Sequence, residues 1–228
     1  MLSAIILAAG KGKRLNAAVP KPLVEIGNKP AIIYSLSSLN KHSSIDEIIV
    51  VLSLANQDKI IKVIKRFNLS KIKAFVIGGR RRQDSVLNGL KAVSKNSDWV
   101  LIHDSARPFI DSKSIKKVIL AARKSSAAIL AVKPKATIKF SHKRNIVSKT
   151  LNRDKLWEVQ TPQVFKKSLI LEAYRKYSKD NVTDDSSLVE KLGKRVVVVE
   201  GDYRNIKITT AEDLLVAGLI IKRKLHAI

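Results

Sequence analysis

Glycines and cations are closely spaced in LAAGKGKRLNAAVPKPL at 7–23, and these residue types are suited to holding phosphate groups. Gly10 and Gly12 let the backbone approach a ligand with its N–H groups free to donate. Arg14 and Lys21 add full positive charges. The stretch is not a Walker A loop, because no Gly-Lys-Ser/Thr follows, and it lacks the third glycine of GxGxxG. It indicates either an anion-binding loop of another kind or a flexible basic surface loop.

A second stretch with polar groups, GGRRRQDSV at 78–86, follows another predicted strand. Gly79 comes at the end of that strand, and Ser85 is expected in the first turn of the next helix. A hydroxyl and free N–H groups at such a place can bind the polar atoms of a ligand. The alternative is that Asp84 or Ser85 only caps the helix.

Asp104 directly follows an apolar strand in IHDSARP at 102–108. A single carboxylate facing a phosphate loop suits Mg²⁺, which typically takes one or two carboxylates together with substrate oxygens. The alternative is that Asp104 pairs with Arg107 or caps a turn. His103 alternates to the other face of the strand and is expected to be structural.

Lys207 lies between two isoleucines in RNIKITT at 204–210, which predicts a short strand at 205–208. On a strand it points away from the isoleucines, either as a solvated edge charge or as a phosphate clamp. Asp184 and Asp185 precede a short predicted helix and are interpreted as its caps. No Ser/His/Asp set or His/Cys cluster stands out, which disfavours acyl-transfer hydrolysis and a zinc site.

Strands and helices must alternate to bring these stretches together, and the hydrophobic pattern predicts that they do. The strands are near-continuous apolar runs, which indicates an α/β fold with a mostly parallel sheet and helices on both faces. Ligands bind at the carboxyl ends of such strands, where the stretches above lie. No linker or repeat divides the chain, so one domain over 1–228 is expected. The predicted strands are 3–8, 46–53, 73–78, 98–104, 127–132 and 195–200, and the predicted helices 31–40, 57–67, 83–93, 114–124, 166–177, 186–192 and from 210.

The alternation breaks between about 134 and 155. TIKFS and NIVSKT flank the polar turn HKR at 142–144, which predicts a hairpin that projects as a β-arm. Apolar side chains on so long an arm are expected to bury against something else, for instance a second subunit; they are Ile138, Phe140, Ile146 and Val147.

The net charge of +25 arises from 44 Lys+Arg against 19 Asp+Glu in 228 residues. It could serve nucleic acid, an anionic membrane or phosphorylated ligands, or it could be a solvated lysine-rich surface. The cations are spread along the chain and aromatics make up only 5%, which disfavours specific nucleic-acid binding. The apolar runs are too short to span a membrane. With no cysteine and no signal-peptide pattern, a cytoplasmic location is expected.

Seven segments, read in order, resemble the 2-C-methyl-D-erythritol 4-phosphate cytidylyltransferase family over nearly the whole chain. They are AAGKGKRL…PKPL, GGRRRQDSVLNGL, VLIHDSARPFI, TIKF, LNRDKLWEVQTPQVF, VTDDSSLVE and NIKITTAEDL. The first alone indicates only a broad sugar-nucleotidyltransferase class. The resemblance implies a Rossmann-like nucleotidyltransferase fold. It also implies transfer of CMP from CTP to methylerythritol phosphate, with release of pyrophosphate, in non-mevalonate isoprenoid synthesis.

The resemblance further implies roles for single residues. Arg14 and Lys21 would stabilise the pentacoordinate α-phosphate. Arg153 and Lys207 would position the methylerythritol phosphate, which Thr137 would contact. Asp104 would bind Mg²⁺. The positions that surround cytosine and ribose in the family correspond here to Leu7, Ala8, Ala9, Gly79, Arg80 and Ser85.

In the family the hairpin is a dimerisation arm that reaches into the partner's site, so Thr137 and Arg153 would act in trans in a homodimer. The chain departs from the family at Ala136, where an acidic residue is often found, and at Arg80 and Arg81, where many members have small or acidic residues. Three other readings remain: a cytidylyltransferase for another polyol phosphate such as ribitol 5-phosphate, a different sugar-nucleotide pyrophosphorylase, and a basic nucleic-acid-binding module.

Overall fold

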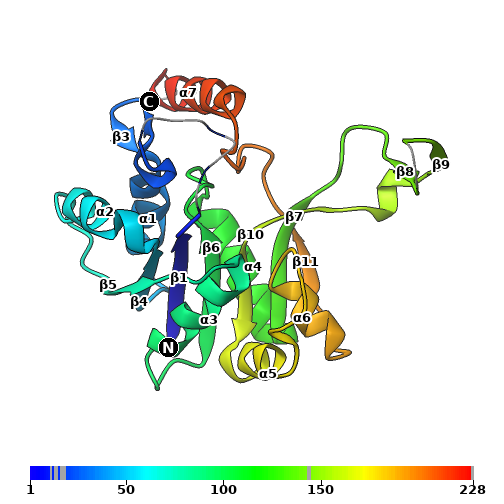
Figure 1. The fold of residues 1–228 in the computed structure, drawn as a ribbon, viewed down its shortest axis with the longest axis horizontal. Helices are drawn as coiled ribbons and strands as arrows, with labels where there is room; N and C mark the ends of the chain where they lie inside the picture. Colours follow the sequence, from blue (N-terminus) through cyan, green and yellow to red (C-terminus); the bar gives the residue numbers. More distant parts are fainter. Residues whose placement is uncertain (11, 13–14, 16–18, 143–144, 227–228) are drawn as a thin grey trace.

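A mixed seven-stranded sheet forms the centre of the computed structural model, which describes residues 1–10, 12, 15, 19–142 and 145–226. The strand order is β11-β7-β10-β6-β1-β4-β5, and every pairing is parallel except the two made by β10 (Figure 1). The expected mostly parallel sheet is confirmed. The strands are β1 (Leu2–Ala8), β4 (Glu47–Leu52), β5 (Ile72–Ile77), β6 (Trp99–Asp104), β7 (Ala127–Val132), β10 (Glu158–Lys166) and β11 (Val197–Glu200).

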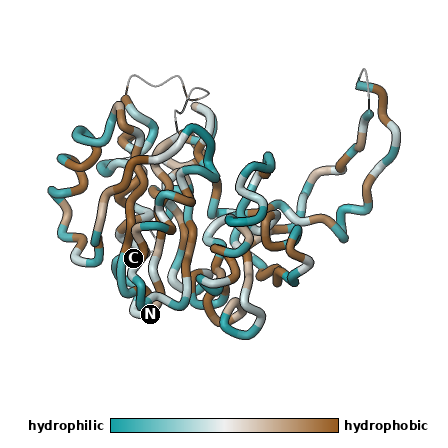
Figure 2. Tube along the Cα trace, turned by 60° about the horizontal axis from the view of Figure 1, so that its bottom comes forward, coloured by the Kyte–Doolittle hydropathy of each residue, from teal (hydrophilic) through white to brown (hydrophobic). Residues whose placement is uncertain are grey.

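Helices cover both faces of this sheet, because the central strands are apolar on both sides. Ile6 of β1 packs into one core cluster with α1, α2 and α4, whereas Ile5 packs into the other with α3, α5 and α6. The central strands accordingly stand out as largely hydrophobic in Figure 2. The helices are α1 (Ala31–Lys41), α2 (Gln57–Ile64), α3 (Arg82–Ala92), α4 (Ser112–Ser125), α5 (Lys167–Tyr177), α6 (Ser186–Lys191) and α7 (Ala211–His226).

A third, smaller core lies beneath α7, where Ala217 packs with Ile26 and Phe109. Next to it a short ribbon of β2 (Glu25–Ile26) and β3 (Lys29–Pro30) leads into α1. Pro30, the last residue of β3, is also the N-cap of that helix. No helix within the described part of the chain is long and apolar enough to cross a membrane.

Two segments differ from the sequence-based expectation. The strand predicted at 205–208 is wrong: this segment forms no ladder, and the Ile208 N–H donates one backbone hydrogen bond to the Ala106 carbonyl. The sequence did not predict β10, the antiparallel strand between β6 and β7. Pro162 in its middle argues against an internal strand. It is tolerated because the register with β7 is irregular between Val159 and Gln163.

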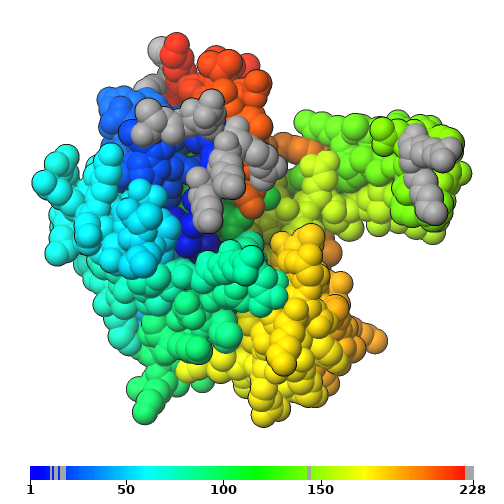
Figure 3. Space-filling view, in the orientation of Figure 1, coloured from blue at the N-terminus to red at the C-terminus, as the bar shows by residue number. Residues whose placement is uncertain are grey.

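The chain between β7 and β10 forms the β-arm (Figures 1 and 3). Its tip pairs β8 (Lys139–Ser141) with β9 (Val147–Thr150) in antiparallel fashion, as the sequence predicts, although residues 143–144 of the turn lie outside the described residues. Phe140, Ile146 and Val147 are 38%, 67% and 56% exposed. The arm therefore presents apolar side chains to its surroundings.

Candidate active site

A cavity of about 450 Å³ opens at the carboxyl ends of β1 and β6, where the sequence places its polar stretches. The residues of the first three stretches and Lys207, far apart in sequence, meet in its wall. The predicted site residues that line it are Leu7, Ala8, Ala9, Gly10, Gly12, Lys21, Gly79, Arg80, Ser85, Asp104 and Lys207.

Three predicted site residues do not contribute to this wall in the described structure. Arg14 lies outside the described residues. Thr137 and Arg153 are exposed on the β-arm, where a guanidinium nitrogen of Arg153 donates to the Lys135 carbonyl at 2.9 Å. Neither lines the cavity of its own chain.

Lys21 opens a short 3-10 helix, Lys21–Leu23, which is entered from Pro20. The stem of Lys21 lies against Gly12, whose φ is +61°. A Cβ added at Gly12 would come within 2.8 Å of the Lys21 Cβ. Glycine is therefore required at position 12 both by the backbone conformation and by the close approach of the lysine.

Ser85 ties the second glycine stretch to α3. Its hydroxyl accepts a hydrogen bond from the Gly79 N–H at 3.1 Å and donates to the Arg81 carbonyl at 3.3 Å. The Asp84 carboxylate accepts from the Arg81 N–H at 3.0 Å, so Asp84 satisfies the first turn of the helix. Ser85 itself lines the cavity.

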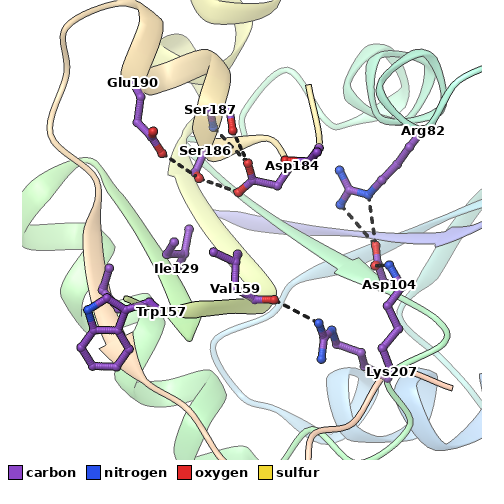
Figure 4. A pocket seen from close by; sticks show the side chains of 13 residues that line it. Arg82, Asp104, Ile129, Trp157, Val159, Asp184, Ser186, Ser187, Glu190 and Lys207 are labelled. Atoms are coloured by element: carbon purple, nitrogen blue, oxygen red, sulfur yellow. Dashed lines mark hydrogen bonds and ion pairs between the residues drawn. The ribbon is translucent and has the colours of Figure 1, made fainter. Parts of the chain in front are cut away.

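Asp104 ends β6 and carries the carboxylate in the cavity wall. One oxygen accepts from Lys207 Nζ at 2.6 Å, and the other accepts from Arg82 Nη2 at 3.2 Å (Figure 4). Burial would raise the pKa of Asp104, but the charges of Arg82 and Lys207 outweigh it and hold that pKa well below its usual range. The carboxylate is therefore ionised at neutral pH.

The alternative that Asp104 pairs with Arg107 does not hold. The Arg107 guanidinium donates to the backbone carbonyls of Asn205 at 2.7 Å and Val159 at 3.1 Å. His103, beside Asp104 in sequence, is buried between Thr161 and the Arg107 carbonyl. Burial lowers the pKa of His103 to about 4, so the ring is neutral at pH 7.

The two aspartates expected to cap α6 divide their roles. Asp184 is a cap: its carboxylate accepts from the Ser187 N–H at 3.3 Å. Asp185 was expected to do the same, but its side chain makes no capping bond. Instead it is 1% exposed and accepts from Arg82 Nη1 at 2.8 Å and from the Tyr174 hydroxyl at 2.6 Å.

A second cavity of about 490 Å³ adjoins the first and shares Arg82, Asp104 and Lys207 with it (Figure 4). The sequence interpretation missed both this cavity and Arg82, one of three consecutive arginines. The sequence could have indicated Arg82, because Arg82, Ser85 and Gly89 have helical spacing. They therefore share one face of α3. The rest of the second cavity is lined by Arg107, Ile129, Trp157, Val159, Thr183, Asp184, Ser186, Ser187, Glu190 and Val198.

No cluster of three or more His, Cys, Asp or Glu side chains able to hold a metal occurs among the described residues. Asp104 is an ionised carboxylate in the wall that the two cavities share. That donor set suits a cation whose other ligands come from water and substrate oxygens, as is usual for Mg²⁺.

Comparison with known proteins gives the same family from three directions. A family model for 2-C-methyl-D-erythritol 4-phosphate cytidylyltransferase matches residues 2–223. A relative of that name from Clostridium botulinum is 46% identical over 223 residues, covering 97% of each chain. One from Geobacillus kaustophilus is 43% identical over 224 residues, again covering 97% of each.

Solved structures agree with these sequence relatives. The 4-diphosphocytidyl-2C-methyl-D-erythritol synthase from Anaerococcus prevotii superposes with a TM-score of 0.86 at 38% identity, covering 97% of this chain and 98% of that one. The 2-C-methyl-D-erythritol 4-phosphate cytidylyltransferase from Thermus thermophilus superposes with a TM-score of 0.78 at 29% identity, covering 96% and 98%. Fold, sequence and family model coincide along almost the full length, and the chain belongs to the 2-C-methyl-D-erythritol 4-phosphate cytidylyltransferase family.

Proposed function

We propose that this chain transfers CMP from CTP to 2-C-methyl-D-erythritol 4-phosphate and releases pyrophosphate, in the synthesis of isoprenoid precursors. Its family membership supports this reaction over transfer to ribitol 5-phosphate or a nucleic-acid-binding role. The observation that carries the proposal is the pair of adjoining cavities that share Arg82, Asp104 and Lys207. Two anionic substrates can meet at that common wall.

The nucleotide belongs in the cavity built from the glycine loop. Gly10 and Gly12 bring backbone N–H groups close to the phosphates, and Arg14 and Lys21 supply charge at the α-phosphate. The base and ribose lie against the small and backbone groups of Leu7, Ala8, Ala9, Gly79, Arg80 and Ser85. The alcohol phosphate occupies the second cavity, where Lys207 orients it.

The reaction is an in-line displacement at the α-phosphate. A phosphate oxygen of the alcohol phosphate forms a bond to the α-phosphorus, and the bond from that phosphorus to the pyrophosphate oxygen breaks. The attacking oxygen is already ionised, so no protein base has to remove a proton. Positioning and charge neutralisation suffice, and Lys21 and Lys207 would supply both.

Mg²⁺ is the proposed metal, with Asp104 as its protein ligand. Bound to Asp104 and to phosphate oxygens, the ion would neutralise the charge that develops as pyrophosphate leaves. Lys207 Nζ is 2.6 Å from the same carboxylate, so an arriving phosphate competes with Asp104 for this ammonium group. That exchange would free a carboxylate oxygen for the metal.

We further propose a cytoplasmic homodimer of one-domain subunits of residues 1–228, joined through the β-arm at 134–155. The exposed Phe140, Ile146 and Val147 support this assembly. Thr137 and Arg153, which are exposed on the arm, would then complete the alcohol-phosphate site of the partner. No specific nucleic acid or membrane partner is proposed.

The reaction can be tested by measuring pyrophosphate release from CTP and Mg²⁺ with methylerythritol 4-phosphate or ribitol 5-phosphate as acceptor, and with UTP in place of CTP. Release is expected with CTP and methylerythritol 4-phosphate. Release with ribitol 5-phosphate alone would support the same reaction type but identify ribitol 5-phosphate as the acceptor. If the folded protein released no pyrophosphate with either acceptor, the proposal would be contradicted.

A further inference from the structure

Three consecutive arginines, Arg80 to Arg82, have different surroundings although they are adjacent in sequence. Arg80 is exposed at the rim of the nucleotide cavity. Arg81 is bound by Asp84 and by the backbone carbonyls of Ser178 and Lys179, which follow α5. Arg82, the first residue of α3, turns inward, and its side chain is only 29% exposed. Among the three, only Arg82 directs its side chain inward.

Arg82 bridges two carboxylates that come from opposite sides of the site. Its Nη1 lies 2.8 Å from an oxygen of Asp185, while Nε and Nη2 lie 3.3 and 3.2 Å from one oxygen of Asp104 (Figure 4 shows the second contact). All three guanidinium nitrogens are thus engaged. A planar guanidinium presents its donors in a fixed fork that matches this bridge, whereas the ammonium group of lysine is a compact charge that does not reproduce the fork.

The far end of the bridge is anchored in the core. Asp185 is 1% exposed, and its other oxygen accepts from the hydroxyl of Tyr174, which is also 1% exposed. A continuous series of contacts therefore runs from Tyr174 of α5 through Asp185 and Arg82 to Asp104. Because its anchor is buried, we expect Arg82 to keep its position when ligands enter the cavities.

The near end of the bridge holds a carboxylate whose other partner can be displaced. Asp104 also accepts from Lys207 at 2.6 Å, and the Lys207 side chain is 41% exposed. An anionic substrate in either cavity competes for this lysine, since both cavities contain it. Arg82 then remains as the partner that fixes the Asp104 carboxylate.

We propose that Arg82 is a positioning residue that holds the Asp104 carboxylate in one orientation between the two cavities, with Asp185 as its anchor. The inference rests on the proposed function, because it assigns Arg82 a task in that reaction. A purely structural ion pair would instead contribute stability without affecting turnover.

The test compares Arg82→Lys and Asp185→Asn with Arg204→Lys as a matched control. Arg204 also binds a carboxylate with its guanidinium, that of Asp202 at 2.6 Å, but it is 66% exposed and lines neither cavity. Far-UV circular dichroism and melting temperature establish that each variant is folded. Pyrophosphate release gives kcat and KM, and calorimetry gives the CTP affinity with and without Mg²⁺.

We expect Arg82→Lys to lower kcat by about 10- to 100-fold, the usual range for partners that orient a ligating group. The KM for CTP should change by less than about threefold, because the lysine keeps the charge but not the bridge. The tightening of CTP binding by Mg²⁺ should shrink. Asp185→Asn should shift both readouts in the same direction by a smaller factor, and it serves as the test if Arg82→Lys does not fold.

The inference is overturned if a folded Arg82→Lys or Asp185→Asn matches Arg204→Lys in kcat and in the effect of Mg²⁺ on CTP affinity. Failure of the proposed function gives a different result: the wild-type chain itself would release no pyrophosphate. In that event the calorimetric comparison still decides whether Arg82 governs Asp104.

Discussion

Lys21 owes its place in the cavity wall to its neighbours in the chain. Pro20 leads into the 3-10 helix that Lys21 begins, and Pro22 follows, so the backbone around the lysine has few alternatives. Gly12 leaves room for the stem of the lysine. The ammonium group is therefore presented at the wall before the nucleotide arrives, which lowers the cost of ordering it.

Lys21→Ala is expected to leave the fold intact and to lower kcat by more than ~100-fold, the scale of losing one preorganised donor to a developing negative charge. Steady-state pyrophosphate release measures the loss. Lys117→Ala, on the exposed side of α4, is the matched control and should retain wild-type turnover. Full activity in Lys21→Ala would remove this lysine from the mechanism.

Single positions in the site differ in how far the sequence could predict them. Gly79, Ser85 and Asp104 follow predicted strands, and the topology of an open sheet brings such positions together. Arg82 and Asp185 could not be assigned in this way, because their pairing joins two helices that are 103 residues apart. Which arginine of three turns inward depends on the packing of α3, and helical spacing alone only suggests it.

At the scale of elements, Glu47 joins the amino-terminal ends of neighbouring strands. It begins β4, and its carboxylate accepts from the hydroxyl of Ser3 at 2.6 Å and from the N–H of Ser94 at 2.8 Å. Lys73 of β5 lies 3.0 Å away. Burial would raise the pKa of Glu47, but these hydrogen bonds outweigh it and lower the pKa from 4.5 to about 2.

The depressed pKa of Glu47 gives stability that is complete above about pH 4.5, the ordinary value, and is lost as the pH falls toward about 2. Glu47→Gln should lower the free energy of unfolding at pH 7 by about 1–3 kcal/mol, because an amide nitrogen in place of the second carboxylate oxygen cannot accept from the Ser94 hydroxyl or attract Lys73. Denaturant titrations at pH 7 and pH 3.5 check this: the gap from wild type should narrow at the lower pH. A constant gap would contradict the assignment. Glu25→Gln, at the exposed position of β2, is the control, and its free energy of unfolding should match that of wild type at both pH values.

The β-arm yields a prediction about assembly. Ile146 and Val147, 67% and 56% exposed, are expected to bury against a second copy of the chain. Replacing both by glutamate should convert a dimer into a monomer at micromolar concentration, as measured by sedimentation velocity. It should also lower kcat/KM for the alcohol phosphate by about 10-fold or more, since Arg153 is proposed to act in the site of the partner subunit. A wild-type monomer would refute the assembly, and so would a glutamate variant that remains dimeric.

The strands show where a local hydrophobic pattern no longer predicts the structure. Continuous apolar runs identified β1, β4 and β7 correctly, because strands buried on both faces consist mainly of apolar residues. β10 contains Pro162 and was missed, whereas the segment 205–208 alternates as a strand does and forms no ladder. Tertiary pairing partners decide both cases, and a local window of sequence does not include them.

At the scale of the whole molecule, the chain carries a net charge of +25, and the proposed substrates of its cavities are anions. Long-range attraction then speeds the encounter with CTP, and added salt screens it. We expect the affinity for CTP to fall by about 10-fold between 50 and 500 mM salt, while kcat at saturating CTP changes much less. Calorimetry and kinetics over this range test the expectation. Affinity that is insensitive to salt would show that the surplus charge is irrelevant to substrate capture.

The β-arm leaves and re-enters the sheet at two residues that already face each other, since Val132 ends β7 opposite Glu158 at the start of β10. The arm is therefore a long excursion of an ordinary hairpin connection. Mutations that change the length of the arm or its surface side chains are therefore expected to leave the pairing of β7 with β10 unchanged. Apart from Thr137 and Arg153, which are proposed to serve the reaction, the proposed subunit contact is thus free to diverge among species faster than the cavities. An inhibitor aimed at that part of the arm would discriminate between relatives that an inhibitor of the cavities does not distinguish.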